Sequence, residues 1–520
     1  MTQQHPEFAA EQLLSDLGYA LDELECDAGA VRCIAVTGSA GKTTMVQMAS
    51  AVLREAGLRV GSFVPCTARA PHGILLQGQP VDAHDYANLD AVVQRSFAPD
   101  ERSEATRLAV ALALFRQAGC DVALLELQQP ALAQGLPNLA AVLVGAIGEP
   151  EQQNVRQAAE AFRTGVPVIT VAGQTPLAAQ RLAEAAETAA CPLIAPDEAD
   201  LSVVIHSSTL TAMDYGGYRV ILPNFGRAMA QDAAAVVELA LSLWRSCGLE
   251  IDDEAILAGL TIYDPSAGPR VVFRKLLTLA DPCHTALQAA ALSNALREAG
   301  LADAEAVLAL QQQDDPESFF TALESGRLTR TVTEKEQLPG MTDSPINRVW
   351  LPLFFTPGMP DDLRDGAQLE QQARYHFEVE TGTLLDRTVY DAFTAAKQSA
   401  TVLCGPAAFT AEAEASLRNR MAEELLEGEA AGLPGEDPDY VAYRAYVMER
   451  FGALEEELTE EMQALLQDSD AGEALFDDEF DADAEDAPQP FAFADAPDDG
   501  WQLEPTPETE GEDEPFDPLS

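Results

Sequence analysis

Short apolar runs alternate with amphipathic segments through the first 210 residues of the chain. The runs are rich in Val, Ile, Leu and Ala, which is typical of strands that are buried on both faces of a sheet. They span 31–38, 59–64, 122–127, 139–148, 167–173 and 201–207. Around them the pattern predicts a helix and loop over 8–29, then helices over 103–118, 154–163 and 177–189. Strands separated by helices predict a parallel sheet that is covered by helices on both faces.

The segment after the first run has the clearest helical period. Its apolar positions recur at intervals of three and four residues over 43–56, and Gly57 ends the pattern. These positions are Met45, Met48, Ala49, Val52 and Leu53. We therefore predict an amphipathic helix over 43–56 that begins directly after a glycine-containing turn.

A second series of strands and helices begins near Val271. Before it, 216–223 is interpreted as an additional β segment that precedes a long helix over 229–247. Pro and Gly cluster in YDPSAGPR, residues 263–270, where we place a hinge. The second series predicts strands over 275–280, 304–311, 349–355 and 400–406. Its helices are predicted over 285–299, 317–325 and 361–376, with a last helix after residue 406.

The alternation predicts an α/β protein in three parts, with a larger domain over 1–268, a smaller α/β domain over 269–428 and a tail over 429–520. Within the tail we predict one acidic amphipathic helix over 438–467. From Asp468 the chain is rich in Asp, Glu and Pro, with isolated Phe residues and Trp501. Such a composition buries too little apolar surface to fold, so we predict a disordered acidic tail.

Charge and hydropathy exclude two kinds of partner. The net charge is −55, from 86 acidic and 31 basic residues, and the tail from Glu455 onward holds 25 acidic residues and no Lys or Arg. Such a chain repels the phosphate backbone of nucleic acids. No apolar run reaches the roughly 18 residues of a membrane span, and the N-terminus is polar rather than a signal peptide. The acidic tail favours solubility, and its aromatic residues leave open a short motif for a protein partner.

Cysteine usage predicts a cytoplasmic location. The eight cysteines are scattered singly along the chain, without a CxxC pair or the dense spacing of a disulfide framework. This usage fits a reducing compartment. The six histidines stand apart from one another, so no cluster of Cys and His predicts a metal site.

The segment VTGSAGKTT, residues 36–44, joins the first predicted strand to the helix. Its glycines permit a tight turn that points backbone N–H groups at phosphate oxygens, and the following helix adds its positive N-terminal end. The lysine would reach the outer phosphates, and a threonine hydroxyl would face Mg²⁺. The residues predicted to bind nucleotide are Gly38, Ser39, Ala40, Gly41, Lys42, Thr43 and Thr44. A glycine turn without a ligand is the competing interpretation, and the strand before and helix after the Gly-Lys-Thr favour nucleotide binding.

The spacing of this loop is shorter than the standard Walker pattern, which would place a glycine where the chain has Val36. The shorter loop resembles that of the Mur ligase superfamily, and its neighbours resemble the folylpolyglutamate synthase/dihydrofolate synthase branch. AGLRVGSFVPCTARAPHGILLQGQPVD is similar to the segment after that family's phosphate-loop helix, and GCDVALLEL to the strand that ends in a Mg²⁺-binding glutamate. The family's entry into its C-terminal domain is similar to SAGPRVV. Its Asp-Gly-Ala-His-Asn-Pro motif is similar to LLTLADPCHTALQAAALSNALREAG. The similar segments follow the family's order over roughly residues 8–420.

This resemblance implies a Mur-ligase-like ATPase domain with a parallel sheet and a smaller, Rossmann-like C-terminal domain. It also implies an ATP-dependent amide ligase. ATP phosphorylates a carboxylate, the amine of a bound glutamate attacks the acyl phosphate, and Mg²⁺ neutralises the transferred charge. ATP and Mg²⁺ are the expected cofactors, and a reduced folate and glutamate are the expected substrates.

The resemblance also assigns roles to residues at matching positions. Lys42 would stabilise the γ-phosphate, while Thr43, Thr44 and Glu126 would hold Mg²⁺. Arg270 would contact the phosphates from the hinge.

Three further residues are expected near the substrates by the same resemblance. Asp281 and His284 would lie at the domain interface near ATP and the incoming amino acid. Arg69 falls on an arginine of the family's substrate segment and is the expected substrate contact.

Several family positions differ in this chain. No histidine lies between His84 and His206, where the family has a second metal ligand, and Glu149 or Gln152 are the candidates in its place. No lysine lies between residues 42 and 275, so the family's carbamylated lysine has no counterpart. The Asn of the family's long-helix motif is Asp232 here.

These differences leave a second hypothesis beside the ligase, a catalytically impaired relative that binds nucleotide and acts as a regulatory or scaffold protein. The GKTT of the loop, in place of the branch's GKGS, leaves a third, a ligase for another carboxylate.

Simpler roles compete at individual residues. Asp281 and His284 would serve equally as caps of the helix that begins near residue 285. Arg69 and Arg270 would serve as surface salt-bridge partners, although the hinge position favours a ligand role for Arg270. Glu126 ends an apolar strand, where a carboxylate needs a partner, which favours the metal role.

Overall fold

The computed structural model describes residues 6–64, 72–97, 103–206, 210–273, 277–283, 285–301, 304–308, 316–323, 327–330, 335–337, 346–351, 393, 396 and 400–430. All of these belong to one compact unit, Met1–Leu458. The predicted helices over 361–376 and 438–467 and the predicted disordered tail lie outside the described residues.

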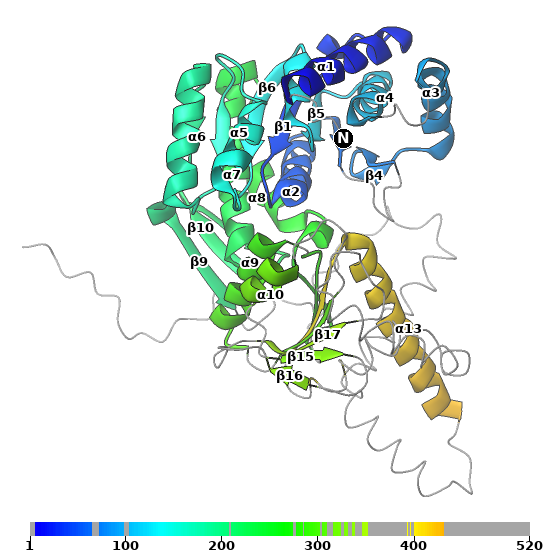
Figure 1. Cartoon of the computed structure of the whole chain (residues 1–520), viewed down its shortest axis with the longest axis vertical. Coiled ribbons are helices and arrows are strands. Elements are labelled where there is room, and N and C mark those ends of the chain that lie inside the picture. Colours follow the sequence, from blue (N-terminus) through cyan, green and yellow to red (C-terminus); the bar gives the residue numbers. More distant parts are fainter. Residues whose placement is uncertain are drawn as a thin grey trace, which may run out of the picture. The chain divides into compact units, whose positions relative to one another are not determined.

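An eight-stranded sheet occupies the N-terminal part of the chain, with strand order β4-β3-β2-β5-β1-β6-β7-β8. Its strands are β1 (Arg32–Thr37), β2 (Val60–Phe63), β3 (Ile74–Leu76), β4 (Gln79–Pro80), β5 (Val122–Glu126), β6 (Leu139–Val144), β7 (Val168–Thr170) and β8 (Leu193–Ile194). The run from β2 to β8 is parallel, and β3 and β4 extend it as an antiparallel edge. The parallel sheet that the apolar runs predict is therefore present (Figure 1).

Helices connect these strands. They are α1 (Pro6–Glu23), α2 (Lys42–Glu55), α3 (Ala83–Ser96), α4 (Glu104–Gln117), α5 (Glu151–Ala159) and α6 (Pro176–Ala189), with the short 3-10 turns η1 (Ala28–Ala30) and η2 (Pro130–Gly135). The predicted helix over 43–56 is confirmed as α2, one residue earlier at each end. The polar segment that forms α3 carried no helix prediction.

Two apolar layers cover the two faces of this sheet, because successive residues of a strand point to opposite sides. Ile34 and Val36 of β1 belong to a core that contains α2. Cys33 and Ala35 belong to the other core, which contains α1, α4, α5 and α6. The helices α7 (Arg227–Cys247) and α8 (Asp253–Ile262) complete the layer on the α2 side.

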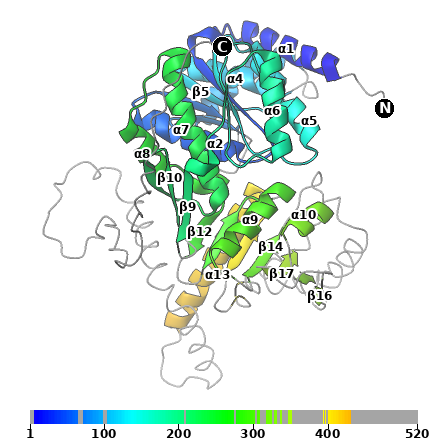
Figure 2. The same ribbon diagram turned by 90° about the vertical axis from the view of Figure 1, so that its left-hand side faces the viewer.

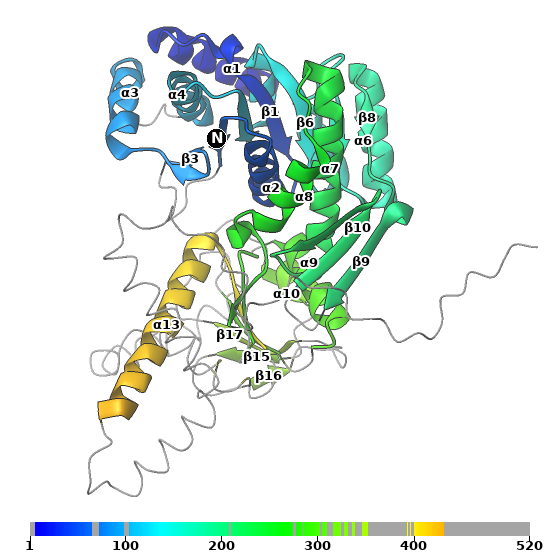
Figure 3. The same cartoon turned by 180° about the vertical axis from the view of Figure 1, so that it is seen from behind.

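One strand of the predicted parallel sheet is in a different sheet. The run over 201–207 forms β9 (Leu201–His206), which follows the 3-10 turn η3 (Glu198–Asp200) and pairs antiparallel with β10 (Leu210–Tyr215). β10, which lies beside β9 (Figure 3), also pairs with β11 (Tyr218–Leu222), the additional β segment, through the two-residue turn Gly216–Gly217. The assignment of β9 to the parallel series was wrong because the short connection to β10 permits only an antiparallel pair.

The C-terminal part forms a seven-stranded sheet of order β12-β13-β18-β14-β17-β15-β16. Its strands are β12 (Arg270–Phe273), β13 (Thr278–Asp281), β14 (Ala304–Leu308), β15 (Arg327–Arg330), β16 (Lys335–Gln337), β17 (Ile346–Leu351) and β18 (Thr401–Cys404). The five central strands are parallel and the two edges are antiparallel. Its helices are α9 (Ala286–Glu298), α10 (Pro316–Leu323) and α13 (Ala407–Ala430), and α9 packs beside α10 (Figure 2).

The 3-10 turn η4 (Pro265–Ala267) precedes β12 and lies in the predicted hinge segment. The domain boundaries near residues 268 and 428 stay predictions. Within the described part of the chain, no helix combines the length and the apolar character that crossing a membrane requires.

Candidate nucleotide and metal site

The loop between β1 and α2 turns on two glycines with left-handed backbone angles. Gly38 has a φ of 121° and Gly41, the residue before α2, has a φ of 82°. A side chain is disfavoured at such angles. A Cβ at Gly38 would lie 2.8 Å from the backbone nitrogen of Gly145. The loop therefore lies directly against the residues that follow β6.

Backbone hydrogen bonds fix the loop in this position. The amides of Ser39 and Ala40 both donate to the carbonyl of Ala146, at 2.9 and 3.1 Å, and the amide of Gly145 donates to Thr37 at 2.8 Å. The first amides of α2, from Lys42 onward, have no carbonyl one turn earlier within the helix. An anion at this loop would thus be met chiefly by the N-terminal turn of α2.

Lys42 begins α2, and its side chain folds back over the loop. Its Nζ donates a hydrogen bond of 2.9 Å to the carbonyl of Gly38. The ammonium group is therefore held above the turn, where it can face a phosphate oxygen.

Thr43 and Glu126 meet across the carboxyl ends of two neighbouring strands. The Thr43 hydroxyl donates a hydrogen bond of 2.6 Å to Oε2 of Glu126. Glu126 is the last residue of β5, which pairs in parallel with β1. Its other oxygen accepts a hydrogen bond of 3.3 Å from the side chain of Gln128. Two of the three residues predicted as metal ligands are thus brought together.

Glu104, the first residue of α4, is a part of this site that the sequence did not reveal. It is buried, and its two oxygens accept hydrogen bonds of 2.8 and 2.7 Å from the amides of Gln128 and Gln129. The carboxylate therefore holds the turn that follows Glu126. An acidic residue in the first turn of a predicted helix is too common a feature to have identified it.

The Glu126 carboxyl lies in an unusual electrostatic setting. Burial raises its pKa above the ordinary value, and the negative charge of Glu104 raises it further. The positive charge of Lys42 and the hydrogen bonds from Thr43 and Gln128 act in the opposite direction. A bound cation would therefore stabilise the charged form of this buried carboxyl and lower its pKa.

The donors at this site suit a hard divalent cation. A hydroxyl and a carboxylate oxygen are ligands that Mg²⁺ takes together with substrate phosphates and water. Glu149 and Gln152, the candidates for a further ligand, are both exposed. Among the described residues no three His, Cys, Asp or Glu side chains form a metal-binding group. Any metal here would depend on Thr43, Glu126 and a phosphate.

Thr44 points in another direction. Its hydroxyl donates to the carbonyl of Ala267 in η4, at 3.4 Å. Gln47, one turn later on α2, bonds to the same segment, with its amide nitrogen 2.9 Å from the Ser266 hydroxyl. Thr43 is therefore better placed than Thr44 to bind a metal. The hydrogen bonds of Thr44 and Gln47 join α2 to the predicted hinge segment.

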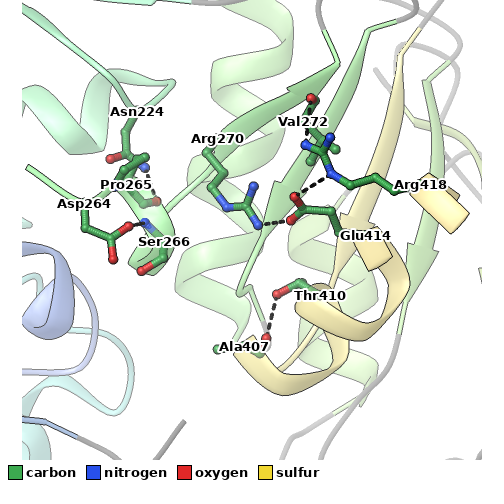
Figure 4. Close-up of polar contacts among 10 residues, drawn as sticks. All are labelled: Asn224, Asp264, Pro265, Ser266, Arg270, Val272, Ala407, Thr410, Glu414 and Arg418. Carbon is green, nitrogen blue, oxygen red and sulfur yellow. Dashed lines mark hydrogen bonds and ion pairs between the residues drawn. The ribbon is translucent and has the colours of Figure 1, made fainter. Parts of the chain in front are cut away.

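Arg270 is engaged within the C-terminal part of the chain. It forms an ion pair and hydrogen bond with Glu414 of α13, which is also paired with Arg418 at 3.2 Å (Figure 4). Burial alone would raise the pKa of Glu414, but the two guanidinium groups hold it below the ordinary value. A phosphate contact from Arg270 would have to replace this ion pair, and it stays a prediction.

Asp281 ends β13 beside Cys404, its partner in the parallel pair with β18. It is buried, and burial raises the pKa of its carboxyl from 3.8 to about 7. Its backbone carbonyl accepts a hydrogen bond of 2.7 Å from the amide of Cys283. The helix cap is provided by Thr285, in a capping box with Gln288. His284 and Arg69 lie outside the described residues, and their roles stay predictions.

Asp232 of α7 lies against the phosphate loop. A Cβ at Gly41 would be 2.6 Å from Oδ1 of Asp232. Burial raises the pKa of this carboxyl well above its ordinary value, and its Oδ2 has no hydrogen-bond partner. A side chain at position 41 is therefore excluded both by the backbone angle and by this contact.

Comparison with known proteins identifies the fold. No protein-family model and no curated protein sequence matches the chain. Its structure is similar to that of Mycobacterium tuberculosis folylpolyglutamate synthase complexed with ADP, with a TM-score of 0.57 and 16% identity over 79% of this chain and 96% of that one.

Two further structures give the same result. The bifunctional folylpolyglutamate synthase/dihydrofolate synthase of Yersinia pestis, complexed with AMPPNP and Mn ion, has a TM-score of 0.53 and 19% identity over 78% of this chain and 93% of that one. The Thermotoga maritima folylpolyglutamate synthase has a TM-score of 0.54 and 17% identity over 79% of this chain and 97% of that one. The chain has the fold of these enzymes, which confirms the fold that the sequence motifs predict.

Proposed function

We propose that the chain is an ATP-dependent ligase that joins a carboxylic acid to an amine. The observation that carries the proposal is the Thr43–Glu126 hydrogen bond of 2.6 Å, beside a loop that holds the Lys42 ammonium over its turn. A phosphate loop next to a strand-end carboxylate is what the transfer of a γ-phosphoryl group requires. The fold, shared with ATP-dependent ligases, supports the same reaction class.

In this proposal the first step forms an acyl phosphate. A carboxylate oxygen of the acid attacks the γ-phosphorus of ATP, the bond to the bridging oxygen breaks, and ADP leaves. The N-terminal turn of α2 and Lys42 bind the phosphates and stabilise the charge that develops on them. Thr43 and Glu126 would hold Mg²⁺, which when bound offsets the charge of the phosphates.

The second step forms the amide. The amine nitrogen attacks the acyl carbon, the carbon–oxygen bond to phosphate breaks, inorganic phosphate leaves and the amine gives up a proton. Glu126 and Glu104 are both buried, so the site is sheltered from water. Exclusion of water would protect the acyl phosphate from hydrolysis until the amine attacks.

A reduced folate as the acid and glutamate as the amine are the finer proposal. It is supported by the order of the similar segments along the chain and by the fold. Another carboxylic acid is the alternative that the GKTT sequence of the loop leaves open.

A nucleotide-binding regulatory protein without ligase activity is the second candidate. The ion pair between Arg270 and Glu414 favours it, because it engages the arginine that was expected to contact phosphate. The set of possible metal ligands is also small, because Glu149 and Gln152, the candidates for a further ligand, are exposed. A weakened metal site agrees with a regulatory protein.

Two measurements test the proposal. Calorimetry should show Mg²⁺-dependent ATP binding that Lys42→Ala weakens by roughly 10-fold or more, since a charge-assisted contact to phosphate is lost. Incubation with MgATP, tetrahydrofolate and glutamate should yield, by mass spectrometry, tetrahydrofolate extended by one glutamate. ATP binding without ADP release in the presence of any acid and amine would favour the regulatory candidate, and no ATP binding would reject both.

A further inference from the structure

A glutamine between β7 and α6 makes three hydrogen bonds at the edge of the sheet where the candidate phosphate loop begins. The side-chain nitrogen of Gln174 donates hydrogen bonds of 2.9 Å to the carbonyl of Gly145 and to the hydroxyl oxygen of Thr170. Its side-chain oxygen accepts a hydrogen bond of 3.0 Å from the backbone amide of Ile147. The two backbone partners are a carbonyl and an N–H, so only one orientation of the side-chain amide satisfies both.

The segment that this glutamine bonds, residues 145–147, is the one against which the loop lies. The Ala146 carbonyl accepts hydrogen bonds of 2.9 and 3.1 Å from the amides of Ser39 and Ala40. Ala40 and Ala146 also pair as an isolated antiparallel bridge. Gln174 therefore holds the segment on both sides of the carbonyl that binds the loop amides.

A second path of contacts leads from the same segment to the ammonium group of Lys42. The amide of Gly145 donates a hydrogen bond of 2.8 Å to Thr37. A Cβ at Gly38 would lie 2.8 Å from the nitrogen of that same amide, so Gly38 and Gly145 are in close contact. The carbonyl of Gly38 accepts the hydrogen bond from Nζ of Lys42. A shift of Gly145 would therefore move the carbonyl that holds Lys42 over the loop.

We propose that Gln174 is a positioning residue, which orders the phosphate loop for nucleotide binding through residues 145–147. The inference rests on the proposed function, in which the phosphates of ATP lie at this loop. The three hydrogen bonds of Gln174 keep the segment in place, and the segment keeps the loop and Lys42 in the orientation that binds phosphate. A loop that is ordered before ATP arrives loses less entropy on binding, which increases the affinity.

A purely structural role is the competing explanation, in which Gln174 only ties the end of β6 to β7. The loss of such a tie would lower the stability of the chain and leave the loop unchanged, so a folded variant would bind nucleotide as the wild type does. A positioning role changes the loop within the folded chain. Nucleotide affinity and the hydrogen exchange of the loop amides therefore separate the two explanations.

The experiment compares Gln174→Met with Gln134→Met in the full chain. Methionine is close to glutamine in length and cannot make these hydrogen bonds. Gln134, which lies before the start of β6, donates hydrogen bonds of 2.8 Å to the carbonyls of Glu160 and Phe162. Its variant thus removes the same kind of bond without touching residues 145–147. Calorimetry measures the binding of a non-hydrolysable ATP analogue with Mg²⁺, and mass spectrometry measures hydrogen exchange over 36–44 without nucleotide.

We expect Gln174→Met to weaken binding of the analogue by about 5- to 20-fold, because two hydrogen bonds to the segment are lost. Exchange over 36–44 should become faster in this variant, since the loop amides lose a fixed partner. Gln134→Met should match the wild type in both measurements. If Gln174→Met does not fold, Thr170→Val takes its place. This change removes only the hydrogen bond to β7, and should weaken binding by about 2- to 5-fold.

Unchanged affinity in the folded variant would overturn the inference, and so would an equal loss of affinity in Gln134→Met. Weaker binding without faster exchange over 36–44 would also overturn it, because Gln174 would then act by another route than the loop. A wild type that binds no ATP analogue would reject the proposed function by itself. Exchange alone would then decide the inference: faster exchange over 36–44 in Gln174→Met supports the positioning of the loop, and unchanged exchange overturns it.

Discussion

At the scale of single residues, the buried Glu126 carboxylate lowers the stability of the folded chain and would serve as a ligand for a cation. Glu126 is buried, stands next to the second carboxylate of Glu104, and has a pKa that burial raises. At neutral pH its charged form is therefore less favourable in the folded chain than in the unfolded one. Such a cost is typical of residues kept for function.

The first prediction concerns Glu126→Gln. Removing the charge should raise the free energy of unfolding in metal-free buffer at pH 7, because a buried carboxylate with a raised pKa is replaced by a neutral isostere. The same variant should lose the Mg²⁺ dependence of ATP binding. Urea denaturation and calorimetry measure the two effects.

Glu187→Gln, an exposed change on α6, is the control and should alter stability by less than about 0.5 kcal/mol. A Glu126→Gln variant that is destabilised, or that still binds ATP in a Mg²⁺-dependent way, would contradict the assigned role.

The second prediction concerns Asp281. Burial raises the pKa of its carboxyl from 3.8 to about 7, so between these values the folded chain holds a proton that the unfolded chain has lost. Stability from this group is therefore full below about pH 4 and falls as the pH rises to about 7. Asp281→Asn, which is neutral throughout, should gain about 3 kcal/mol more over the wild type at pH 8 than at pH 4.

Thermal unfolding at the two pH values measures the difference, with the exposed Asp22→Asn change on α1 as a control for net charge. An equal effect of Asp281→Asn at pH 4 and pH 8 would show that the carboxyl does not titrate in this window.

Local sequence was enough to predict some residues of the candidate site and not others. Lys42, Thr43 and Glu126 could be predicted because a glycine turn and the end of an apolar strand mark them. Glu104 could not be, since its partners are amides 24 and 25 residues later. The ion pair that engages Arg270 was equally hidden, because Glu414 is 144 residues away.

At the scale of elements, α2, the helix that follows the candidate phosphate loop, is held by a close contact with a second helix. α8 packs against α2 through Gly259, where a Cβ would lie 2.4 Å from both the Cα and the nitrogen of Val52. The two helix backbones therefore touch at this glycine. A side chain there would have to displace the helix that begins with Lys42.

The third prediction is that Gly259→Ala destabilises the chain by roughly 1–3 kcal/mol, because the added methyl group meets backbone that cannot move aside. Gly18→Ala on α1 is the matched control. It has no atom within 4 Å of its Cβ position, and should stabilise the chain by about 0.5–1 kcal/mol through helix propensity. Denaturant unfolding of both variants measures the effects, and a Gly259→Ala variant as stable as Gly18→Ala would refute the close contact.

Hydrophobic periodicity predicted the elements whose pattern was strong. It failed where two kinds of strand have the same pattern and where the pattern was weak. The apolar face of α2 identified that helix within one residue at each end. Apolar character alone could not separate β9 from a parallel strand, because buried strands of both kinds share it. α8 carried no helix prediction, and Gly259 in its interior lowers its helix propensity.

At the scale of the whole molecule, hydrogen bonds join α2, which follows the candidate phosphate loop, to the segment that leads into the second sheet. Thr44 and Gln47 of α2 bond to Ala267 and Ser266, a few residues before β12. Phe225, which precedes α7, belongs to the same apolar core as Leu279 of β13. The order of similar segments along the sequence predicted this fold, but the order of strands within each sheet depends on contacts between distant residues.

The central claim is that ATP activates a carboxylic acid as an acyl phosphate. The most direct test uses tetrahydrofolate labelled with ¹⁸O in its carboxylates, together with MgATP and glutamate, and measures the mass of the phosphate released. We predict that each phosphate carries one ¹⁸O atom, because the bond between the acyl carbon and that oxygen breaks when the amine attacks. No phosphate at all would show that tetrahydrofolate and glutamate are not the substrates, and the same label would then be placed in another carboxylic acid. Unlabelled phosphate would show that ATP is only hydrolysed, which would contradict the proposed ligase.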